Sequence, residues 1–159
     1  MGESDASSRR EDDAEETVEA RERRLREEAA QHGLFGLLGL DVESAREGRA
    51  VLTVPFDETF TNLPNDSMHG GVTAALIDTA SGFALRSTFG SGVGLTTTDM
   101  NVRYVRPATA DLRAEAHVVR AGTSVGVTEC EVTSVAPDGD RKVVATGGTT
   151  YRLFRGDSA

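Results

Sequence analysis

The second half of the chain contains four long segments in which apolar and polar residues alternate. These segments are residues 93–105, 112–120, 124–135 and 142–154. Alternation with a period of two predicts β-strands that each bury one face. The turns between them are supplied by Pro107, Gly122 and residues 137–140, so consecutive strands are expected to pair antiparallel. A sheet of this kind must cover its apolar face with another element.

Residues 69–88 form the only long segment that can provide this cover. They are mostly good helix formers and carry an apolar stripe. The stripe consists of Val72, Ala75, Leu76, Thr79 and Phe83. Upstream, residues 34–40 predict a short apolar helical turn and residues 49–54 predict a strand. The sequence therefore predicts an α+β domain in which an antiparallel sheet wraps around one long central helix.

The first 30 residues differ in composition, with eleven acidic residues and six arginines. A segment with so few large apolar residues cannot bury enough surface to offset its ordering entropy. We expect the first fifteen residues or so to be disordered and residues 16–31 to form a surface helix with pairs such as Glu19–Arg23. The charged extension (1–30) is interpreted as a solvated tail that precedes a single domain at residues 31–155.

The net charge of −9 argues against nucleic acid as a partner. The sequence has no apolar run of about 18 residues, which a membrane span needs, and no segment resembling a signal peptide. The single cysteine, Cys130, permits a reducing compartment and is expected in the core or at a sheet face. The three histidines lack metal-ligand spacing, so no metal is expected. We therefore expect a cytoplasmic protein without a membrane or nucleic-acid partner.

Residues 68–80 give the strongest functional signal. His69, Gly70 and Gly71 stand at the start of the predicted helix, and Asp78 follows about two turns later. A helix N-terminus offers free N–H groups and a partial positive charge, which suit an oxyanion. Glycines allow a ligand to approach the backbone closely. Asp78 is the only carboxylate of the predicted helix, which makes it the candidate acid or base.

These residues resemble a known motif. His69-Gly70-Gly71, with Asp78 nine residues after the histidine, is similar to the motif of the PaaI-type acyl-CoA thioesterases. These are 4-hydroxybenzoyl-CoA thioesterase-like enzymes with the hotdog fold. Residues 97–108 resemble the second signature of this family, a strand with the pattern D-x-x-x-x-Y-x-R-P-A. The resemblance covers residues 34–154 and implies a single hotdog domain that hydrolyses acyl-CoA thioesters with aromatic or medium-chain acyl groups.

The resemblance also implies roles for single residues. Asp78 would act as general base or nucleophile, and the backbone N–H of Gly70 would contact the oxyanion. His69 would orient the substrate carbonyl or hold the loop, and Thr97 would position the attacking water. Gly71 would lie against the bound substrate. No cofactor is implied, because CoA is part of the substrate.

Two parts of the family pattern are less regular in this chain. The family commonly has an asparagine six residues before the histidine, where this sequence has Leu63. In the family this asparagine helps position the thioester or the water. We assign Asn62 to that role, with Asn65 as the alternative. The family often has a basic residue in the turn after the second of the four strands, and here that turn has none. Arg106 or Arg120 is therefore expected to contact the CoA phosphates.

The spacing along the helix has a consequence for assembly. Gly70 and Asp78 are eight residues apart, which corresponds to about 12 Å along the helix axis. One reacting group cannot lie within about 3 Å of both residues of the same chain. If both act, Gly70 of one chain must work with Asp78 of another. We therefore predict a homodimer or homotetramer with sites shared between chains.

A non-catalytic acyl-CoA binding or sensing hotdog module is the alternative function, and such a module would have no need of Asp78.

By strand alternation, Thr97 is expected to share a face with Asp99 and Asn101, opposite Met100.

Overall fold

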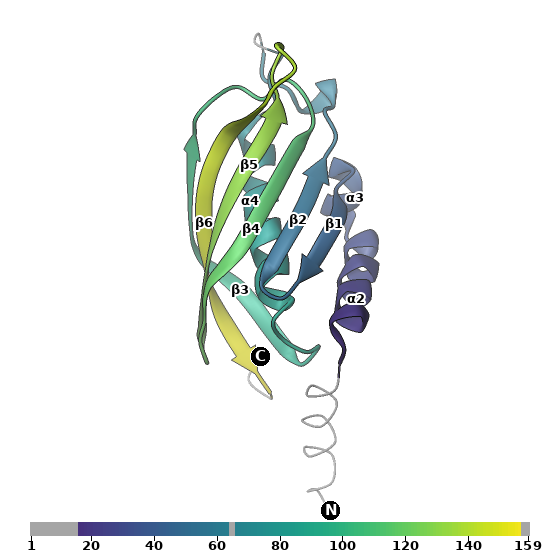
Figure 1. The fold of residues 1–159 in the computed structure, drawn as a ribbon, viewed down its shortest axis with the longest axis vertical. Coiled ribbons are helices and arrows are strands. Elements are labelled where there is room, and N and C mark those ends of the chain that lie inside the picture. The colour runs from purple at the N-terminus through teal and green to yellow at the C-terminus, as the bar shows by residue number, and fades with distance from the viewer. Residues whose placement is uncertain (1–15, 64–65, 157–159) are drawn as a thin grey trace, which may run out of the picture.

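The computed structural model describes residues 16–63 and 66–156. Its strands form one antiparallel sheet in the order β1-β2-β4-β5-β6-β3, which curves around the helix α4 (Figure 1). The strands are β1 (Asp41–Arg46), β2 (Arg49–Val54), β3 (Val93–Tyr104), β4 (Leu112–Ala121), β5 (Val125–Val135) and β6 (Arg141–Arg155). The helices are α2 (Val18–Gln31), α3 (Gly33–Leu38) and α4 (Gly70–Arg86), with a 3₁₀ turn, η1 (Glu58–Phe60). The predicted architecture is confirmed.

The helix α4 is buried more completely than a single apolar stripe requires. Ile77, Ala80 and Ala84 are fully buried, although none of them belongs to the predicted stripe. Ala75 and Thr79, which do belong to it, are only half-buried. The reason is that the sheet curves around the helix and contacts it from β2, β4, β5 and β6. Of the helices described, none combines the length and apolar character needed to cross a membrane.

A bulge in β3 changes which side chains face α4. The pairing of β3 with β6 shifts its register between Thr97 and Asp99. Thr97 lies opposite Tyr151, which is buried on the side of the helix. The prediction that Thr97 shares a face with Asp99 and Asn101 is therefore wrong, because the extra residue Thr98 reverses the alternation.

The helix expected at residues 16–31 is confirmed as α2, but it is not part of a solvated tail. Leu25 is 0% exposed and Ala29 is 7% exposed, and both belong to the main core. The predicted Glu19–Arg23 pair is not among the ion pairs of the described residues. The disorder expected for residues 1–15 lies outside the residues described, and the boundary at residue 30 stays a prediction.

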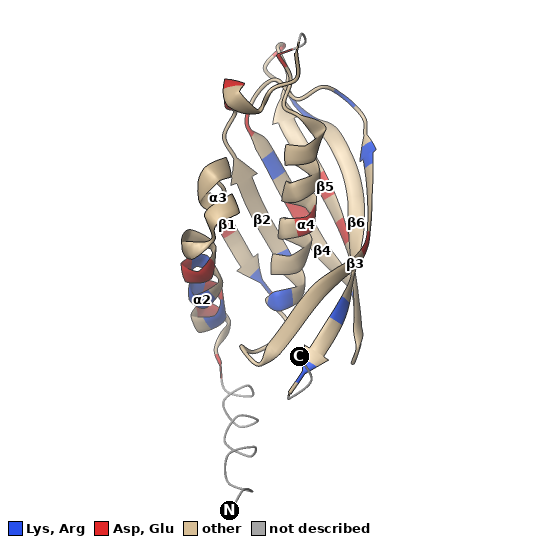
Figure 2. Ribbon diagram, turned by 180° about the vertical axis from the view of Figure 1, so that it is seen from behind, with Lys and Arg blue, Asp and Glu red and all other residues tan. Residues whose placement is uncertain are grey.

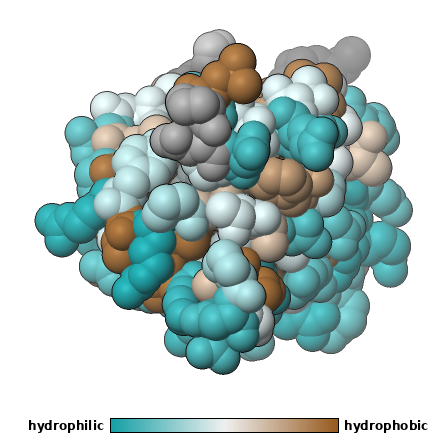
Figure 3. Space-filling view, turned by 90° about the horizontal axis from the view of Figure 1, so that it is seen from above, coloured by the Kyte–Doolittle hydropathy of each residue, from teal (hydrophilic) through white to brown (hydrophobic). Residues whose placement is uncertain are grey.

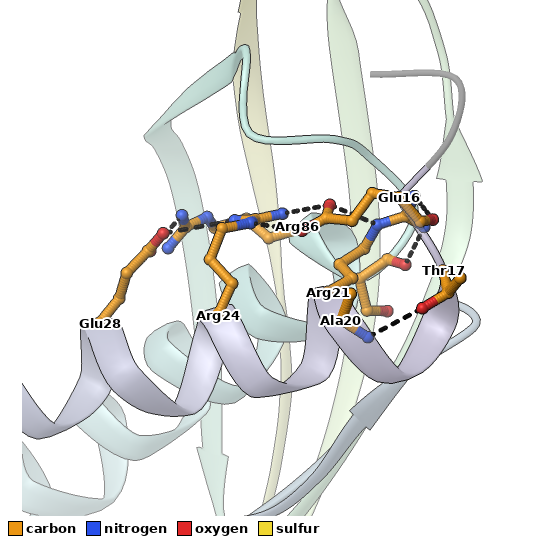
Figure 4. A network of polar contacts seen from close by, with 8 residues as sticks. Glu16, Thr17, Ala20, Arg21, Arg24, Glu28 and Arg86 are labelled. Atoms are coloured by element: carbon orange, nitrogen blue, oxygen red, sulfur yellow. Dashed lines mark hydrogen bonds and ion pairs between the residues drawn. The ribbon is translucent and has the colours of Figure 1, made fainter. Parts of the chain in front are cut away.

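Ion pairs connect α2 to the end of α4 (Figure 4). Glu16 accepts hydrogen bonds from Arg21 at 3.3 Å and from Arg24 at 2.9 Å. Glu28 pairs with Arg24 and also with Arg86, the last residue of α4. Charges that the sequence assigned to a solvated surface therefore join two helices.

The helix α2 also occupies the outer edge of β1. Glu22 is 6% exposed and accepts a hydrogen bond from the backbone N–H of Ala45 at 3.0 Å. Arg26 donates to the carbonyls of Val42 and Glu43. These side chains take the place of a further strand beside β1. The opposite edge strand, β3, pairs only with β6 within the described part of the chain.

Candidate active site

The first half of the candidate site is the start of α4, where His69 caps the helix. The backbone N–H of Gly71 donates to Nδ1 of His69 at 2.8 Å. Since Nδ1 is an acceptor, the proton of the neutral imidazole lies on Nε2. The ring is exposed, and no acceptor for Nε2 is recorded in the described residues, so this N–H can donate to a bound molecule.

Gly70 is the first residue of α4 and carries the candidate oxyanion donor. Its backbone N–H has no hydrogen-bond acceptor within residues 16–63 and 66–156. Its carbonyl accepts a hydrogen bond from the Tyr104 hydroxyl at 2.7 Å. A Cβ on Gly70 would lie 3.0 Å from the Tyr104 ring, and one on Gly71 would lie 2.8 Å from Nδ1 of His69. The two glycines therefore make room for aromatic rings of this chain.

A groove of about 610 Å³ runs beside this helix start. Its lining includes Asn62, His69, Gly70, Gly71, Tyr104 and Arg106. The Asn62 amide donates to the Met68 carbonyl at 3.4 Å, and Arg106 donates to the Val143 carbonyl at 2.8 Å. Figure 3 views this end of the molecule and shows apolar patches among hydrophilic residues. Asn65, the alternative site asparagine, lies outside the described residues.

The second half of the candidate site surrounds Asp78 on α4, the helix that Figure 2 shows in front of the sheet. The Thr97 hydroxyl donates to Oδ1 of Asp78 at 2.8 Å. The Tyr151 hydroxyl lies 2.5 Å from the Asp78 carbonyl oxygen and 3.2 Å from Oδ1. Asp78 is half-buried and does not line the groove beside Gly70.

The predicted CoA-binding arginines lie at opposite ends of the chain's sheet. Arg106 lines the groove beside Gly70. Arg120 is eight residues beyond Leu112 on β4, which corresponds to about 26 Å along the strand. The two side chains of one chain therefore do not meet at one site.

The structure gives no catalytic arrangement for Cys130. It is 4% exposed, and burial raises the pKa of its thiol to about 12. A thiol in this state is protonated and unreactive at neutral pH. Of the two locations predicted for Cys130, the core and a sheet face, the structure shows the core. In the residues described, no group of three His, Cys, Asp or Glu side chains is arranged to hold a metal ion.

Comparison with known proteins identifies the family. The thioesterase superfamily profile matches residues 65–138. A Halobacterium salinarum protein described as an esterase is 45% identical over 132 residues, which are 79% of this chain and 87% of that protein. The chain belongs to the thioesterase superfamily. It is therefore a thioester hydrolase, and the predicted family and hotdog fold are confirmed.

The PaaI acyl-coenzyme A thioesterase of Escherichia coli is 32% identical to this thioesterase over 123 residues, which are 76% of this chain and 77% of PaaI. Its solved structure gives a TM-score of 0.67, covering 82% of this chain and 96% of PaaI. A thioesterase family protein from Silicibacter pomeroyi gives a TM-score of 0.80 at 23% identity, covering 88% of this chain and 100% of that protein. At that identity the likeness shows the fold alone.

The sequence interpretation gave no role to the two tyrosines of the thioesterase. Tyr104 contacts Gly70 in one half of the site, and Tyr151 contacts Asp78 in the other. Tyr104 belongs to the strand signature, so its position was a signal that could have been used. Tyr151 carries no such signal, because its contact with Asp78 depends on how β6 packs against α4.

Proposed function

We propose that the thioesterase hydrolyses acyl-CoA thioesters with aromatic or medium-chain acyl groups, and that Asp78 acts on the thioester. The hydrogen bonding of the Asp78 carboxylate is the observation that supports this proposal. Oδ1 accepts from Thr97 and lies near the Tyr151 hydroxyl, whereas Oδ2 has no partner among the described residues. A carboxylate with one oxygen fixed and one open can take a proton from water or attack a carbonyl directly. The acyl-CoA part of the proposed substrate class is supported by the name of the relative, the acyl-coenzyme A thioesterase PaaI.

In the general-base route, a water molecule bonds to the thioester carbon while its proton moves to Asp78. The carbonyl electron pair moves to oxygen, where the Gly70 N–H and the Nε2–H of His69 stabilise the charge. The C–S bond then breaks, and the CoA thiolate takes up the proton. In the nucleophilic route, Asp78 bonds to the thioester carbon and the C–S bond breaks, which releases CoA thiolate and leaves an acyl anhydride. Water then adds to the anhydride, which frees the carboxylic acid and restores the Asp78 carboxylate, and the thiolate takes up the proton that the water loses. Thr97 holds the carboxylate in both routes.

The two halves of the site support sharing between chains. Gly70 and Asp78 lie on one continuous helix and are about 12 Å apart along its axis. Asp78 lies outside the groove that Gly70 lines. A second chain that presents its own Asp78 at this groove would complete a site, and a two-fold axis would complete two.

The free edge of β3 is the proposed contact between the two chains. This strand has twelve residues, and most of them are exposed. Its large apolar side chains include Met100, 39% exposed, and Tyr104, 56% exposed, and Val105 directly after it is 46% exposed. Unpaired backbone groups beside apolar side chains favour pairing with another strand. The edge of β1 lacks this capacity because Glu22 and Arg26 occupy it.

Arg106 is the proposed phosphate contact in the groove. Its guanidinium donates one hydrogen bond to the Val143 carbonyl, which fixes its orientation and leaves further N–H groups for an anion. Arg120 lies too far along β4 to reach the same substrate from the same chain. Arg120 would therefore contact the CoA phosphates only from the partner subunit.

The activity is tested by measuring free thiol release from a panel of acyl-CoA esters with short, medium, long and aromatic acyl groups. We expect kcat/KM of about 10⁴ M⁻¹ s⁻¹ or more for the best ester, in the medium-chain or aromatic range. Binding of CoA esters without thiol release would favour the non-catalytic alternative. A preference for long chains would contradict the proposed acyl range.

Mixing two inactive variants tests whether sites are shared. One variant carries Asp78→Asn and the other carries Gly70→Pro, so each lacks one half of the site. After subunit exchange at equal amounts, half of the dimers contain both chains, and each of these has one intact site. We expect about one quarter of the wild-type activity to return. No recovery despite exchange, which a tagged pull-down can verify, or an active monomer in light scattering would contradict sharing.

A further inference from the structure

The Tyr151 phenol reaches α4 at the residue that we propose to be catalytic. Tyr151 lies on β6, is 1% exposed and packs with Leu85 and Leu153. Its hydroxyl is 2.5 Å from the Asp78 carbonyl oxygen and 3.2 Å from Oδ1 of the same residue. One hydroxyl group is thus within hydrogen-bond distance of both the backbone and the side chain of Asp78.

Neighbouring residues preserve this contact. A Cβ on Gly82 would lie 3.4 Å from the Tyr151 hydroxyl oxygen, an ordinary contact distance, so the phenol packs directly against the helix at this point. Burial raises the pKa of Tyr151 well above its ordinary value, and the Asp78 carboxylate raises it further. The phenol therefore stays protonated and acts as a hydrogen-bond donor throughout the physiological pH range.

The hydrogen bonds distinguish the two oxygens of Asp78. The Thr97 hydroxyl donates to Oδ1 from β3, and Tyr151 approaches the same oxygen from β6. Within the described residues, neither hydroxyl contacts Oδ2. Two donors from two strands thus constrain the rotation of the carboxylate about its χ2 bond.

We propose that Tyr151 is a positioning residue for thioester hydrolysis, which holds Asp78 so that Oδ2 is the oxygen that acts. This inference rests on the proposed function, because it assumes that Asp78 is catalytic. Tyr151 touches neither water nor thioester in this role. It acts through Asp78, by fixing both the helix backbone and the carboxylate at one point.

The groups that face Asp78 are few, which makes a pH profile informative. Tyr151 is the titratable group that contacts it from β6, and β3 contributes the neutral Thr97 hydroxyl. No ion pair with Asp78 is recorded in the part of the chain described. A change in the donors to Oδ1 should therefore appear directly in the acidic limb of the pH–rate profile.

The test compares Tyr151→Phe with the wild type over a range of pH, using the best ester of the panel. Removal of a donor to the carboxylate disfavours its charged form, so the acidic limb of kcat/KM should move to higher pH by about 0.5 to 1 unit. Loss of orientation should lower kcat by about 10-fold at the optimum, with KM nearly unchanged.

Thr128→Val is the matched control. Thr128 is 2% exposed on the neighbouring strand β5, and its hydroxyl donates to the Thr149 carbonyl at 3.1 Å. This variant also removes one buried hydroxyl without a large change in volume. Thr128→Val should lower the melting temperature about as much as Tyr151→Phe does, but it should leave kcat and the acidic limb of the pH–rate profile unchanged.

A second probe keeps the ring in place. The chain has two tyrosines, so 3-fluorotyrosine incorporated into a Tyr104→Phe background reports on Tyr151 alone. A fluorinated phenol is a stronger donor, and the acidic limb should move to lower pH than in the Tyr104→Phe parent. This measurement remains decisive if Tyr151→Phe does not fold.

The outcomes separate this inference from the proposed function. If Asp78→Asn is inactive but Tyr151→Phe or the fluorinated protein keeps an unshifted acidic limb, the role of Tyr151 is refuted and the proposed function stands. If Asp78→Asn keeps wild-type activity, both are refuted. An equal loss of activity in Tyr151→Phe and Thr128→Val would reduce Tyr151 to a structural residue.

Discussion

Replacement of Asp78 by Asn is expected to lower kcat for acyl-CoA hydrolysis by about 10³-fold, with KM nearly unchanged. Asn has almost the same shape and can still accept the Thr97 hydrogen bond through its amide oxygen. It cannot take a proton from water or form an acyl anhydride. The loss would therefore fall on the chemical step, measured as the rate of thiol release at saturating ester.

Asp99→Asn is the control for this prediction. Asp99 lies two residues from Thr97 on β3, is exposed and faces away from α4 because of the bulge. The same chemical change at that position should alter kcat by less than about 2-fold. If Asp78→Asn keeps more than a tenth of the wild-type kcat, Asp78 is not the base or nucleophile.

Gly70→Pro is expected to lower kcat by about 10² to 10³-fold, because it removes the N–H that would contact the oxyanion. Proline is well tolerated at the first residue of a helix, which is the position of Gly70 in α4. The preceding residue, His69, has φ −59° and ψ 134°, values that a residue before proline adopts readily. The helix should therefore form normally, and circular dichroism can verify this.

Gly70→Ala separates the loss of the N–H from crowding. A Cβ at this position would lie 3.0 Å from the Tyr104 ring, so both variants push against Tyr104, but only Gly70→Ala keeps the N–H. Tyr104 is 56% exposed and has room to move. We expect Gly70→Ala to lose about 10-fold or less. Equal losses in both variants would indicate that the position of Tyr104, and not the N–H, determines the rate.

The sequence predicted most of the fold because its patterns are local. The helix expected at residues 69–88 is α4 (Gly70–Arg86), and the four alternating segments are β3 to β6. The face of Thr97 could not be predicted, because the bulge at Thr98 arises from the pairing of β3 with β6. Alternation along one strand contains no information about an extra residue in its register.

The N-terminal helix shows a second limit of composition. Residues 1–30 contain few large apolar residues, and charge patterning alone favours a solvated tail. Leu25 and Ala29 nevertheless join α2 to the core, and Glu22 and Arg26 beside Leu25 bind the backbone of β1. Such an interaction depends on where the edge of the sheet lies in space.

The candidate site could be predicted in part. The motif placed His69 and Gly70 at the helix start, and the structure brings them to one groove with Asn62 and Arg106. It also pairs Asp78 with Thr97, which are 19 residues apart in sequence. The anchoring of each half by a tyrosine was not predicted, because hydrogen bonds between distant strands and helices follow from packing rather than from a motif.

The cover that α2 places on β1 has a consequence for the size of any assembly. A sheet with two open edges can add copies at both, and growth then has no natural end. Because Glu22 and Arg26 occupy the edge at β1, each chain has one sheet edge, at β3, that can pair with another strand. Two such chains joined through β3 leave nothing for a third to extend. In the proposed dimer, the N-terminal helix would therefore limit strand pairing to one closed pair of chains.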